Sequence, residues 1–492
     1  MFNKIASNTI AQVVSKIITA VISIFLLSVV TNYLSVELFG VYSKVYNYLG
    51  IFAFLADLGL YTIMIREISK WEEKSEKIVW NVLTLRILLW VIIFFLALLV
   101  AYFIPGYNSN IELIAIWIVW IFTVISLINS TFLAYMQSQL KMEFSLFSVV
   151  FWKLVNLWII LLIVFVFLTK ESVLQNNALS LDNSLLYILG AWLIWITVNT
   201  MLNYFYASKS CNICMKFDRD YIKHIFKISL PYWIALFLSV VYFKIDIIII
   251  SLLEWNTADI SIALYSLPMK IVEVLMVISG FYLNSILPKL SQLFEKQKET
   301  WELQILLTLS FKILFSFGLS VFTFWVIFRD YLITIIANSN YISPTNHIYS
   351  SSDVFIIVLA ILLFNAISLL FIYIFIWSKK QSILLKINII IALFNIIWNF
   401  ILIPKYSFIW AWVVTLVSQI ILFIVCYYYS RKIVKFTFPI AFIIKAVSIS
   451  SVFFVTLYYL TINHSMWIFQ DLFIYGIPWF IIYIYCIYKL IK

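Results

Sequence analysis

Two hydrophobic segments near the middle of the chain decide its fold. Residues 226–255 read FKISLPYWIALFLSVVYFKIDIIIISLLEW, and residues 260–288 read ISIALYSLPMKIVEVLMVISGFYLNSILP. Each segment is long enough to cross a bilayer as one helix. Each also holds one basic and one acidic residue inside apolar sequence: Lys244 and Asp246 in the first, Lys270 and Glu273 in the second. A fold that places these helices in lipid must therefore shelter four charges.

These four charges would oppose insertion if they faced lipid. On insertion scales one charge at a helix centre costs about 2.5 to 3.5 kcal/mol, so we expect all four to face protein or a water-filled path. On a helix Lys244 and Asp246 point about 200° apart, whereas Lys270 and Glu273 share a face. Two interpretations stay open: the charges form structural ion pairs between helices, or the lysines serve an anionic substrate.

The composition is that of a membrane protein. The chain has 492 residues, of which 65% are hydrophobic and 11% charged, and its mean hydropathy is +1.06. These values exclude a soluble globular protein. The net charge of +11 indicates membrane topology and does not predict a nucleic-acid partner, because basic residues concentrate on the cytoplasmic side of membrane proteins. We interpret residues 10–30 as a retained first span, since this run is too long for a signal-peptide core.

The sequence predicts no catalytic, metal or cofactor site, and hence not an enzyme. Cys211 and Cys214 form a lone CxxC, and with His224 as the nearest further candidate they leave a four-ligand zinc site incomplete. The three histidines lie far apart. Residues 218–220 have the acid-x-acid form of metal-dependent glycosyltransferases, but they lie in a short basic loop without a nucleotide-binding domain.

Fourteen hydrophobic stretches predict an all-α, polytopic membrane fold. They are residues 10–30, 46–65, 78–103, 113–133, 147–168, 185–206, 228–253, 262–286, 305–328, 354–377, 382–403, 408–429, 440–460 and 469–488. The termini and the connections after even-numbered spans hold 21 Lys and Arg. Connections after odd-numbered spans hold four, namely Lys44, Lys170, Arg329 and Lys405. This asymmetry predicts a multi-pass protein of the cell (inner) membrane with both termini in the cytoplasm.

The connections also predict how the chain is divided. Residues 211–227 form the longest inward connection and are expected to be a cytoplasmic hinge loop. They separate an N-terminal six-helix bundle, residues 1–210, from a C-terminal six-helix bundle, residues 228–435. An even number of spans in each half makes the halves parallel repeats. Residues 436–492 supply two further helices outside the repeat.

Several motifs carry a family resemblance. Residues 30–70 read VTNYLSVELFGVYSKVYNYLGIFAFLADLGLYTIMIREISK. This run resembles the opening of bacterial polysaccharide (O-antigen type) flippases of the multidrug/oligosaccharidyl-lipid/polysaccharide (MOP) exporter superfamily. There a first helix precedes Leu-x-x-x-x-Phe-Gly-x-Tyr, and a second ends in Asp-Leu-Gly and then an arginine. The matching residues here are Leu34, Phe39, Gly40, Tyr42, Asp57, Leu58, Gly59 and Arg66.

The resemblance continues over about 400 residues in the same order. It includes LYSLPMKIVEV at 264–274, NSILPKLSQL at 284–293 and NIIWNFILIPKY at 395–406. The departures are mostly at small residues. Ala263 stands where the family usually has Gly, and Ser407 and Trp410 replace small residues after Leu-Ile-Pro.

The resemblance implies a fold and a function. The implied fold is two six-helix bundles in a V around a central cavity. The implied function is the movement of polyprenyl-pyrophosphate-linked oligosaccharide from the cytoplasmic to the outer leaflet by alternating access, for cell-surface polysaccharide biosynthesis. The expected partners are this lipid-linked substrate and the bilayer, together with polysaccharide polymerase or assembly proteins. Coupling to protons or sodium is left open.

The implied headgroup needs cations for its pyrophosphate and polar groups for its sugars. The candidate cavity cations are Lys244, Lys270, Lys16, Arg86 and Lys153. Lys16, Arg86 and Lys153 lie only about 9 to 12 Å from the ends of their helices, so they could instead extend to the interface. The carboxylates Asp246, Glu273 and Asp57 could couple an ion or form ion pairs. Asn395 and Asn399 share a helix face and could bind sugars or bridge helices.

Other functions stay open. An ion-coupled multidrug exporter or a peptidoglycan-precursor flippase of the same superfamily would share this fold. An integral membrane glycosyltransferase or polymerase is a different class. It would need a large outward loop with acidic or arginine-rich chemistry, and the predicted outward connections are short.

Overall fold

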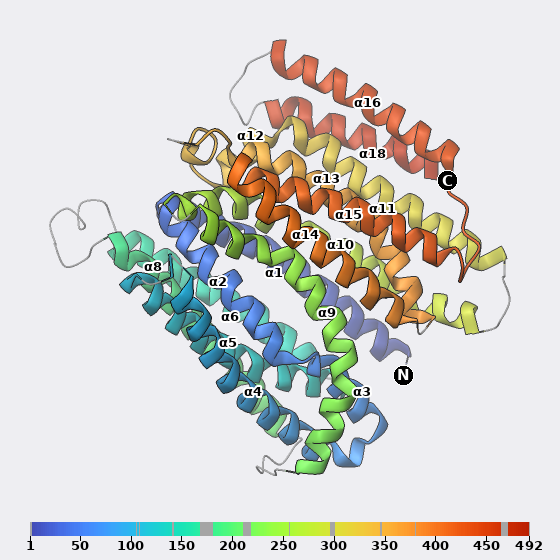
Figure 1. Cartoon of the computed structure of the whole chain (residues 1–492). Coiled ribbons are helices and arrows are strands. Elements are labelled where there is room, and N and C mark those ends of the chain that lie inside the picture. Colours follow the sequence, from blue (N-terminus) through green and yellow to red (C-terminus); the bar gives the residue numbers. More distant parts are fainter. Residues whose placement is uncertain are drawn as a thin grey trace. The chain divides into compact units, whose positions relative to one another are not determined.

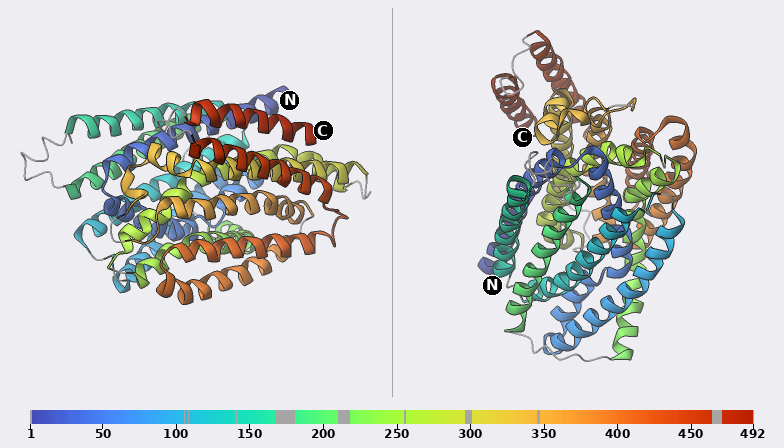
Figure 2. Two further views of the ribbon diagram at one scale, coloured as in Figure 1. Left: turned by 90° about the horizontal axis from the view of Figure 1, so that it is seen from above. Right: turned by 90° about the vertical axis from the view of Figure 1, so that its left-hand side faces the viewer.

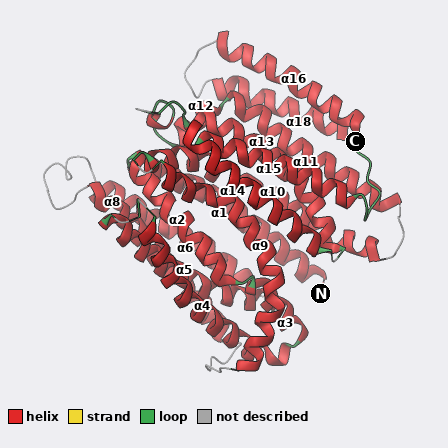
Figure 3. Cartoon of the chain, viewed as in Figure 1, coloured by secondary structure: helices red, strands yellow, loops and turns green. Residues whose placement is uncertain are grey.

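The computed structural model is helical throughout the part of the chain that it describes. It describes residues 2–491 except for 105, 108, 140–141, 168–180, 210–217, 255, 296–300, 345–346, 379 and 464–470. Within those limits no strand occurs (Figure 3). The prediction of an all-α membrane fold is confirmed. Its physical reason is that lipid offers backbone groups no hydrogen-bond partner, so an apolar segment must satisfy them within its own helix.

The contacts divide the chain into a first unit, Met1–Ala263, and a second unit, Leu264–Lys492. Figure 1 labels the helices. Those of the first unit are α1 (Phe2–Tyr33), α2 (Val36–Asp57), α3 (Leu60–Lys70), α4 (Ser75–Phe103), α5 (Asn110–Ser138), α6 (Met142–Leu162), α8 (Leu181–Ser208) and α9 (Arg219–Leu253). A π-helical turn, Ile163–Phe167, extends α6, and a 3₁₀ turn, Glu72–Lys74, precedes α4.

The second unit contains most of α10 (Ala258–Glu295), which begins in the first unit. The other helices are α11 (Trp301–Ile327), α12 (Arg329–Ile336), α13 (Ser351–Trp377), α14 (Gln381–Tyr406), α15 (Ile409–Ser430), α16 (Ile440–Asn463) and α18 (Ile477–Ile491). A 3₁₀ turn, Ser339–Tyr341, follows α12, and a π-helical turn, Asp471–Gly476, leads into α18.

The predicted spans coincide with helices. Twelve helical segments of the described part are long and apolar enough to cross a membrane, and α1 contains a shorter apolar stretch, Ile18–Tyr33. Together with α9, which holds the predicted span 228–253, they correspond to the fourteen predicted spans. The chain is therefore a polytopic membrane protein.

One predicted span was wrong in its position. The segment 46–65 is not one helix, because α2 ends at Asp57 and α3 begins at Leu60. Leu58 and Gly59 between them both have left-handed backbone, with φ of +50° and +65°. Helix α2 instead begins at Val36, where the Ser35 side chain accepts a hydrogen bond from the backbone of Leu38. Hydropathy misses this start because Lys44 lies in the third turn and is buried in protein, out of contact with lipid.

Helix α2 is the most enclosed helix of the first unit. It contacts α4, α5 and α9, while α5 packs along α8, α1 along α6, and α6 along α8. Tyr48 in its middle is fully buried, and its hydroxyl donates a 2.5 Å hydrogen bond to the Ala97 carbonyl of α4. Most side chains of α2 therefore face other helices and not lipid, and this makes polar residues tolerable there.

The predicted hinge loop, 211–227, is shorter than expected. Residues 211–217 lie outside the described residues, and α9 is helical from Arg219 onward. Asp218 caps this helix, because its carboxylate accepts hydrogen bonds from the backbone of Asp220 and Tyr221. The same carboxylate pairs with Lys77 of α4, and this hydrogen bond holds the pKa of Asp218 below its usual value. A good N-cap thus converts residues 219–227 from the predicted loop into helix.

The division by contacts lies inside α10 and not in the predicted hinge, because α9 packs on α2 and α4 of the first unit. The predicted repeat of 1–210 and 228–435 describes a relationship in sequence and stays a prediction. The V-shaped arrangement that the resemblance implies also stays a prediction.

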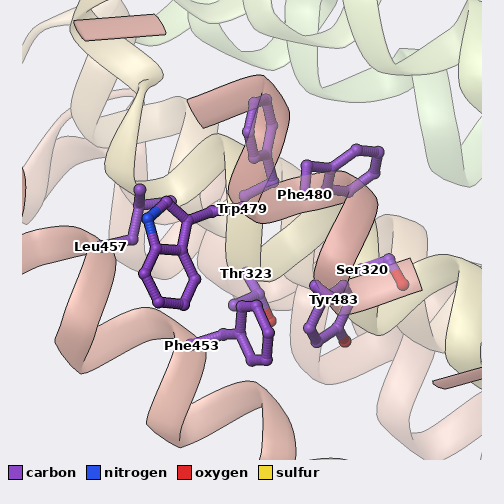
Figure 4. A pocket seen from close by; sticks show the side chains of 8 residues that line it. Ser320, Thr323, Phe453, Leu457, Trp479, Phe480 and Tyr483 are labelled. Carbon is purple, nitrogen blue, oxygen red and sulfur yellow. The ribbon is translucent and has the colours of Figure 1, made fainter. Parts of the chain in front are cut away.

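In the second unit α13 packs against α11 and α15, and α14 packs against α15. The last two helices, α16 and α18, lie side by side and join the unit through α11 (Figures 1 and 2). Between these three helices mostly aromatic side chains line a small, partly open pocket of about 10 Å³, which Figure 4 shows. At its edge the hydroxyls of Tyr483 and Ser450 lie 2.7 Å apart. This contact joins α16 to α18, and the aromatic packing holds both helices on α11.

Candidate functional site

A buried cluster of charges surrounds Lys44 of α2. The Lys44 side chain is only 1% exposed, and its ammonium pairs with the Glu112 carboxylate of α5. It also lies 2.6 Å from Asp259 Oδ1 at the start of α10, and it donates a 2.6 Å hydrogen bond to the Gly106 carbonyl. Sequence analysis counted Lys44 among the residues of an outward connection, whereas the structure places it inside a helix. The cluster holds one positive and two negative charges.

Local structure positions the partners of Lys44. Glu112 belongs to a capping box, in which Ser109 accepts from the Glu112 backbone and Glu112 accepts from that of Ser109. Gly40, one turn before Lys44 on α2, allows α10 to approach, since a Cβ at Gly40 would lie 1.8 Å from the Asp259 carbonyl oxygen. The Tyr107 ring lies 5.3 Å from the ammonium, and burial raises the pKa of Tyr107 well above its usual value.

Arg86 of α4 is paired with the end of α2. Its guanidinium lies 2.5 Å from Asp57 Oδ1, and the Arg86 side chain is only 1% exposed. The same guanidinium donates to the hydroxyls of Ser130 and Thr131 on α5, at 2.9 and 2.5 Å. Arg86 therefore does not extend to the interface. Asp57, one of the candidate coupling carboxylates, forms an ion pair here.

Lys153 and Lys16 belong to α6 and α1. Lys153 is half-buried, and its ammonium donates a 2.5 Å hydrogen bond to the Ser23 hydroxyl of α1. A neutral hydroxyl leaves the lysine charge uncompensated. Lys16 lies in α1, and its side chain is outside the described part of the structure.

Lys244 and Asp246 of α9 differ in their surroundings. Asp246 is fully buried and has a polar or charged partner. Lys244 is half-buried, and its ammonium lies against Gly50 of α2, where a Cβ would be 3.3 Å from Nζ. Among the described residues Lys244 has no ion-pair partner. The separation of about 200° on the helix accounts for the difference.

Lys270 and Glu273 both lie on α10. Lys270 is half-buried and Glu273 is exposed. The described residues include no ion-pair partner for Glu273. The predicted helix face is thus present, but the interpretation of this pair as an internal ion pair finds no contact in the structure.

Asn395 and Asn399 of α14 are fully buried. The Asn395 amide donates a 3.3 Å hydrogen bond to the Thr415 hydroxyl of α15, and the Asn399 amide donates a 3.0 Å bond to the Asn395 carbonyl. Asn395 therefore bridges α14 and α15, and Asn399 supports it from the same helix. Their contact with sugars stays a prediction.

Comparisons with known proteins add to this description of the site. Residues 5–294 match the family described as polysaccharide biosynthesis protein. This chain belongs to that family. The match covers the first unit, including Lys44, Arg86 and Lys244, and α10 with Lys270. A search of curated proteins finds no match.

Solved structures share the fold of this family member. A Lipid II flippase MurJ in an inward closed conformation has 16% identity and a TM-score of 0.72, covering 99% of this chain and 100% of that one. An inward-facing multidrug resistance MATE family transporter of the MOP superfamily has 12% identity and a TM-score of 0.69, covering 86% and 97%. A MOP superfamily transporter from Pyrococcus furiosus has 11% identity and a TM-score of 0.55, covering 86% and 95%. These likenesses show that the chain shares its membrane fold with transporters and a flippase.

Sequence reasoning missed two buried polar groups of this family member. One is the Lys44 cluster, for which the Ser109-x-x-Glu112 capping pattern was the available signal. The other is an amide network, in which Asn203 of α8 donates to the side-chain carbonyls of Asn129 (2.7 Å) and Asn199 (3.2 Å). Neither shows in hydropathy, because each is completed by residues of another helix, Lys44 by Glu112 and Asn203 by Asn129.

The cations of the first unit thus fall into two groups. Lys44 and Arg86 are paired with carboxylates and connect helices. Lys153 and Lys244 are half-buried, and no carboxylate of the described part pairs with them. The second group can bind an anion without first breaking an ion pair. Of the two cysteines of the CxxC, neither lies in the described residues, and the described residues hold no group of three or more potential metal ligands.

Proposed function

We propose that the protein moves a polyprenyl-pyrophosphate-linked oligosaccharide from the cytoplasmic to the outer leaflet of the cell (inner) membrane. The movement follows alternating access and serves cell-surface polysaccharide biosynthesis. Family membership supports the pathway class. One observation carries the substrate class: Lys244 is a half-buried lysine of a membrane helix whose ammonium lies beside Gly50, without an ion-pair partner among the described residues.

An unpaired lysine at this place raises the free energy of the folded protein in the membrane unless an anion binds to it. Keeping a charge in a membrane helix costs a few kcal/mol, and a structural lysine recovers this cost through a carboxylate, as Lys44 does. Lys244 recovers it when an anion is bound. Phosphate oxygens are strong acceptors for ammonium donors, so a pyrophosphate fits the requirement. Lys153, Lys270 and Lys16 would supply further positive charge along the path.

The proposed direction of transport rests on topology. The 21 to four distribution of basic residues supports cytoplasmic termini. The substrate would be taken up where the basic connections lie and released on the opposite side. Coupling to protons or sodium is not part of this proposal.

The experiment that tests the proposal measures transport and folding separately. In a deletion strain, surface glycan is labelled and the lipid-linked precursor inside the cell is quantified. Cells that carry Lys244→Ala should accumulate precursor and lose surface glycan, while the amount of monodisperse purified protein stays unchanged. Lys244→Arg should retain part of the transport, because it keeps the charge. Full transport by Lys244→Ala would refute the role of this lysine.

The same experiment separates the proposal from a peptidoglycan-precursor flippase, which the fold shared with a Lipid II flippase brings into consideration. Both substrates carry an anionic headgroup, so Lys244 does not discriminate between them. Loss of surface glycan with normal cell-wall synthesis supports the oligosaccharide substrate. Accumulation of the cell-wall precursor would refute the oligosaccharide substrate and favour the peptidoglycan-precursor flippase.

A further inference from the structure

A cationic pocket lies in the second unit, away from the residues discussed above. Its volume is about 380 Å³, and it is bordered by the first half of α11, by residues 435–437 before α16, and by Ile491 at the end of α18. This volume lies in the range of small-molecule sites. The pocket therefore joins three elements that are distant in sequence.

Two lysines give the pocket its charge. Lys312 of α11 is half-buried, and its ammonium lies 5.3 Å from the Phe442 ring. Lys435 borders the pocket from the segment before α16, and it is exposed. The described residues that line the pocket include no acidic side chain. A ligand that enters it therefore meets the Lys312 ammonium beside apolar and hydroxyl-bearing side chains.

Helix α11 presents two parallel stripes to this pocket. Gln304, Thr308 and Lys312 follow each other at intervals of four residues, so they form one polar stripe. Trp301, Ile305 and Leu309 form an apolar stripe with the same spacing beside it. Their exposed fractions are 77%, 43% and 38%, so this stripe is open to the surroundings. A ligand that matches both stripes has an anionic end and an apolar chain.

We propose that this pocket binds an anionic phospholipid of the cytoplasmic leaflet. The phosphate lies between Lys312 and Lys435, with the hydroxyls of Thr308 and Thr437 as further donors, and one acyl chain lies along Trp301, Ile305 and Leu309. The leaflet follows from the topology of the proposed function, on which this part of the inference rests. A tryptophan at the start of the helix suits the interface, where such residues concentrate.

The bound lipid would strengthen the attachment of the last two helices. Its phosphate contacts α11 and the segment before α16, and its chain lies near the end of α18. This role concerns stability, and it does not require the lipid to be transported. The lipid-binding inference can therefore fail while the proposed transport holds, and the proposed transport can fail while the lipid-binding inference holds.

The test uses the full-length protein in detergent, with thermal unfolding and native mass spectrometry as readouts. Phosphatidylglycerol should raise the unfolding temperature and remain bound in the gas phase, whereas phosphatidylcholine should do neither. Lys312→Gln and Lys435→Gln should each weaken phosphatidylglycerol binding about fivefold, since one interfacial lysine contributes on this scale. Lys432→Gln is the matched control, because Lys432 lies outside the pocket, is exposed and contacts the Tyr428 ring.

Each outcome decides the inference. An equal effect of both lipids, or unchanged binding by the two pocket variants, overturns it. A shift produced by inorganic phosphate alone assigns the pocket to free phosphate and removes the lipid. Lys244→Ala should bind phosphatidylglycerol normally, so a loss of transport by that variant stays distinguishable from a loss of this site.

Discussion

The Lys44 ammonium lies 2.6 Å from the Asp259 carboxylate and pairs at the same time with Glu112. This relationship connects α2, α5 and the start of α10 through one side chain that is only 1% exposed. The Asp259 contact is an ion pair without hydrogen-bond geometry. The stronger part of the cluster is therefore Lys44 with Glu112, whose side chain is 6% exposed.

Replacement of Lys44 should destabilise the protein. Lys44→Met leaves the buried Glu112 carboxylate without its counter-charge, and the loss of one partner of a buried pair costs about 3 kcal/mol or more. The unfolding temperature in detergent should fall clearly. The double variant Lys44→Met/Glu112→Gln should recover part of the loss, because only the more exposed Asp259 carboxylate is then left without its counter-charge. An unfolding temperature equal to that of the unchanged protein would show that the cluster contributes nothing.

Arg86 and Asp57 should prove coupled in a double-mutant cycle. Arg86→Gln and Asp57→Asn each leave a charge with no partner, and the double variant leaves none. The loss of unfolding free energy in the double variant should therefore differ from the sum of the two single losses by about 1 to 3 kcal/mol, as is found for residues in contact. Chemical unfolding of the four proteins measures this. Additive losses would mean that the contact carries no energy.

Gly50 should matter for transport more than for stability. Gly50→Ala places a methyl group 3.3 Å from the Lys244 ammonium and should shift it only slightly, while the helix gains up to about 1 kcal/mol in propensity. Gly50→Leu should displace the ammonium and abolish transport. Gly190→Ala is the control, because nothing lies within 4 Å of a Cβ there. Transport by Gly50→Leu at the normal rate would show that the position of Lys244 is unimportant.

Ser407 should be replaceable with a gain in stability. It joins α14 and α15 with a φ of +66° and a ψ of −175°, a region that side chains rarely adopt. Ser407→Gly removes this strain and should raise the free energy of unfolding by about 1 kcal/mol. Trp410→Gly, in the first turn of α15, should lower it instead, because it removes the ring that packs against Tyr406. Thermal unfolding of both variants distinguishes local strain from a general effect of glycine.

The number of membrane helices was predictable because hydropathy records it directly. Within the described residues every predicted span except 46–65 coincides with helix. There Lys44 made a buried part of α2 resemble a connection, since hydropathy cannot tell whether a charge faces lipid or a carboxylate. The length of the hinge was also misjudged, because the cap at Asp218 depends partly on Lys77 of another helix.

The candidate site was predictable only as a set of residue types. Lysines and carboxylates within apolar segments were recognised, but their pairing was not. Lys244 and Asp246 are two residues apart and differ in burial, whereas Arg86 and Asp57 lie on different helices and form one ion pair.

The amino-acid sequence by itself determined that this protein is a bundle of membrane-crossing helices, since lipid leaves apolar segments no other way to satisfy their backbone. Only the tertiary structure decided which charges are neutralised and which stay available. The reason is that an ion pair depends on the distance between side chains from different helices, and local sequence contains no record of that distance.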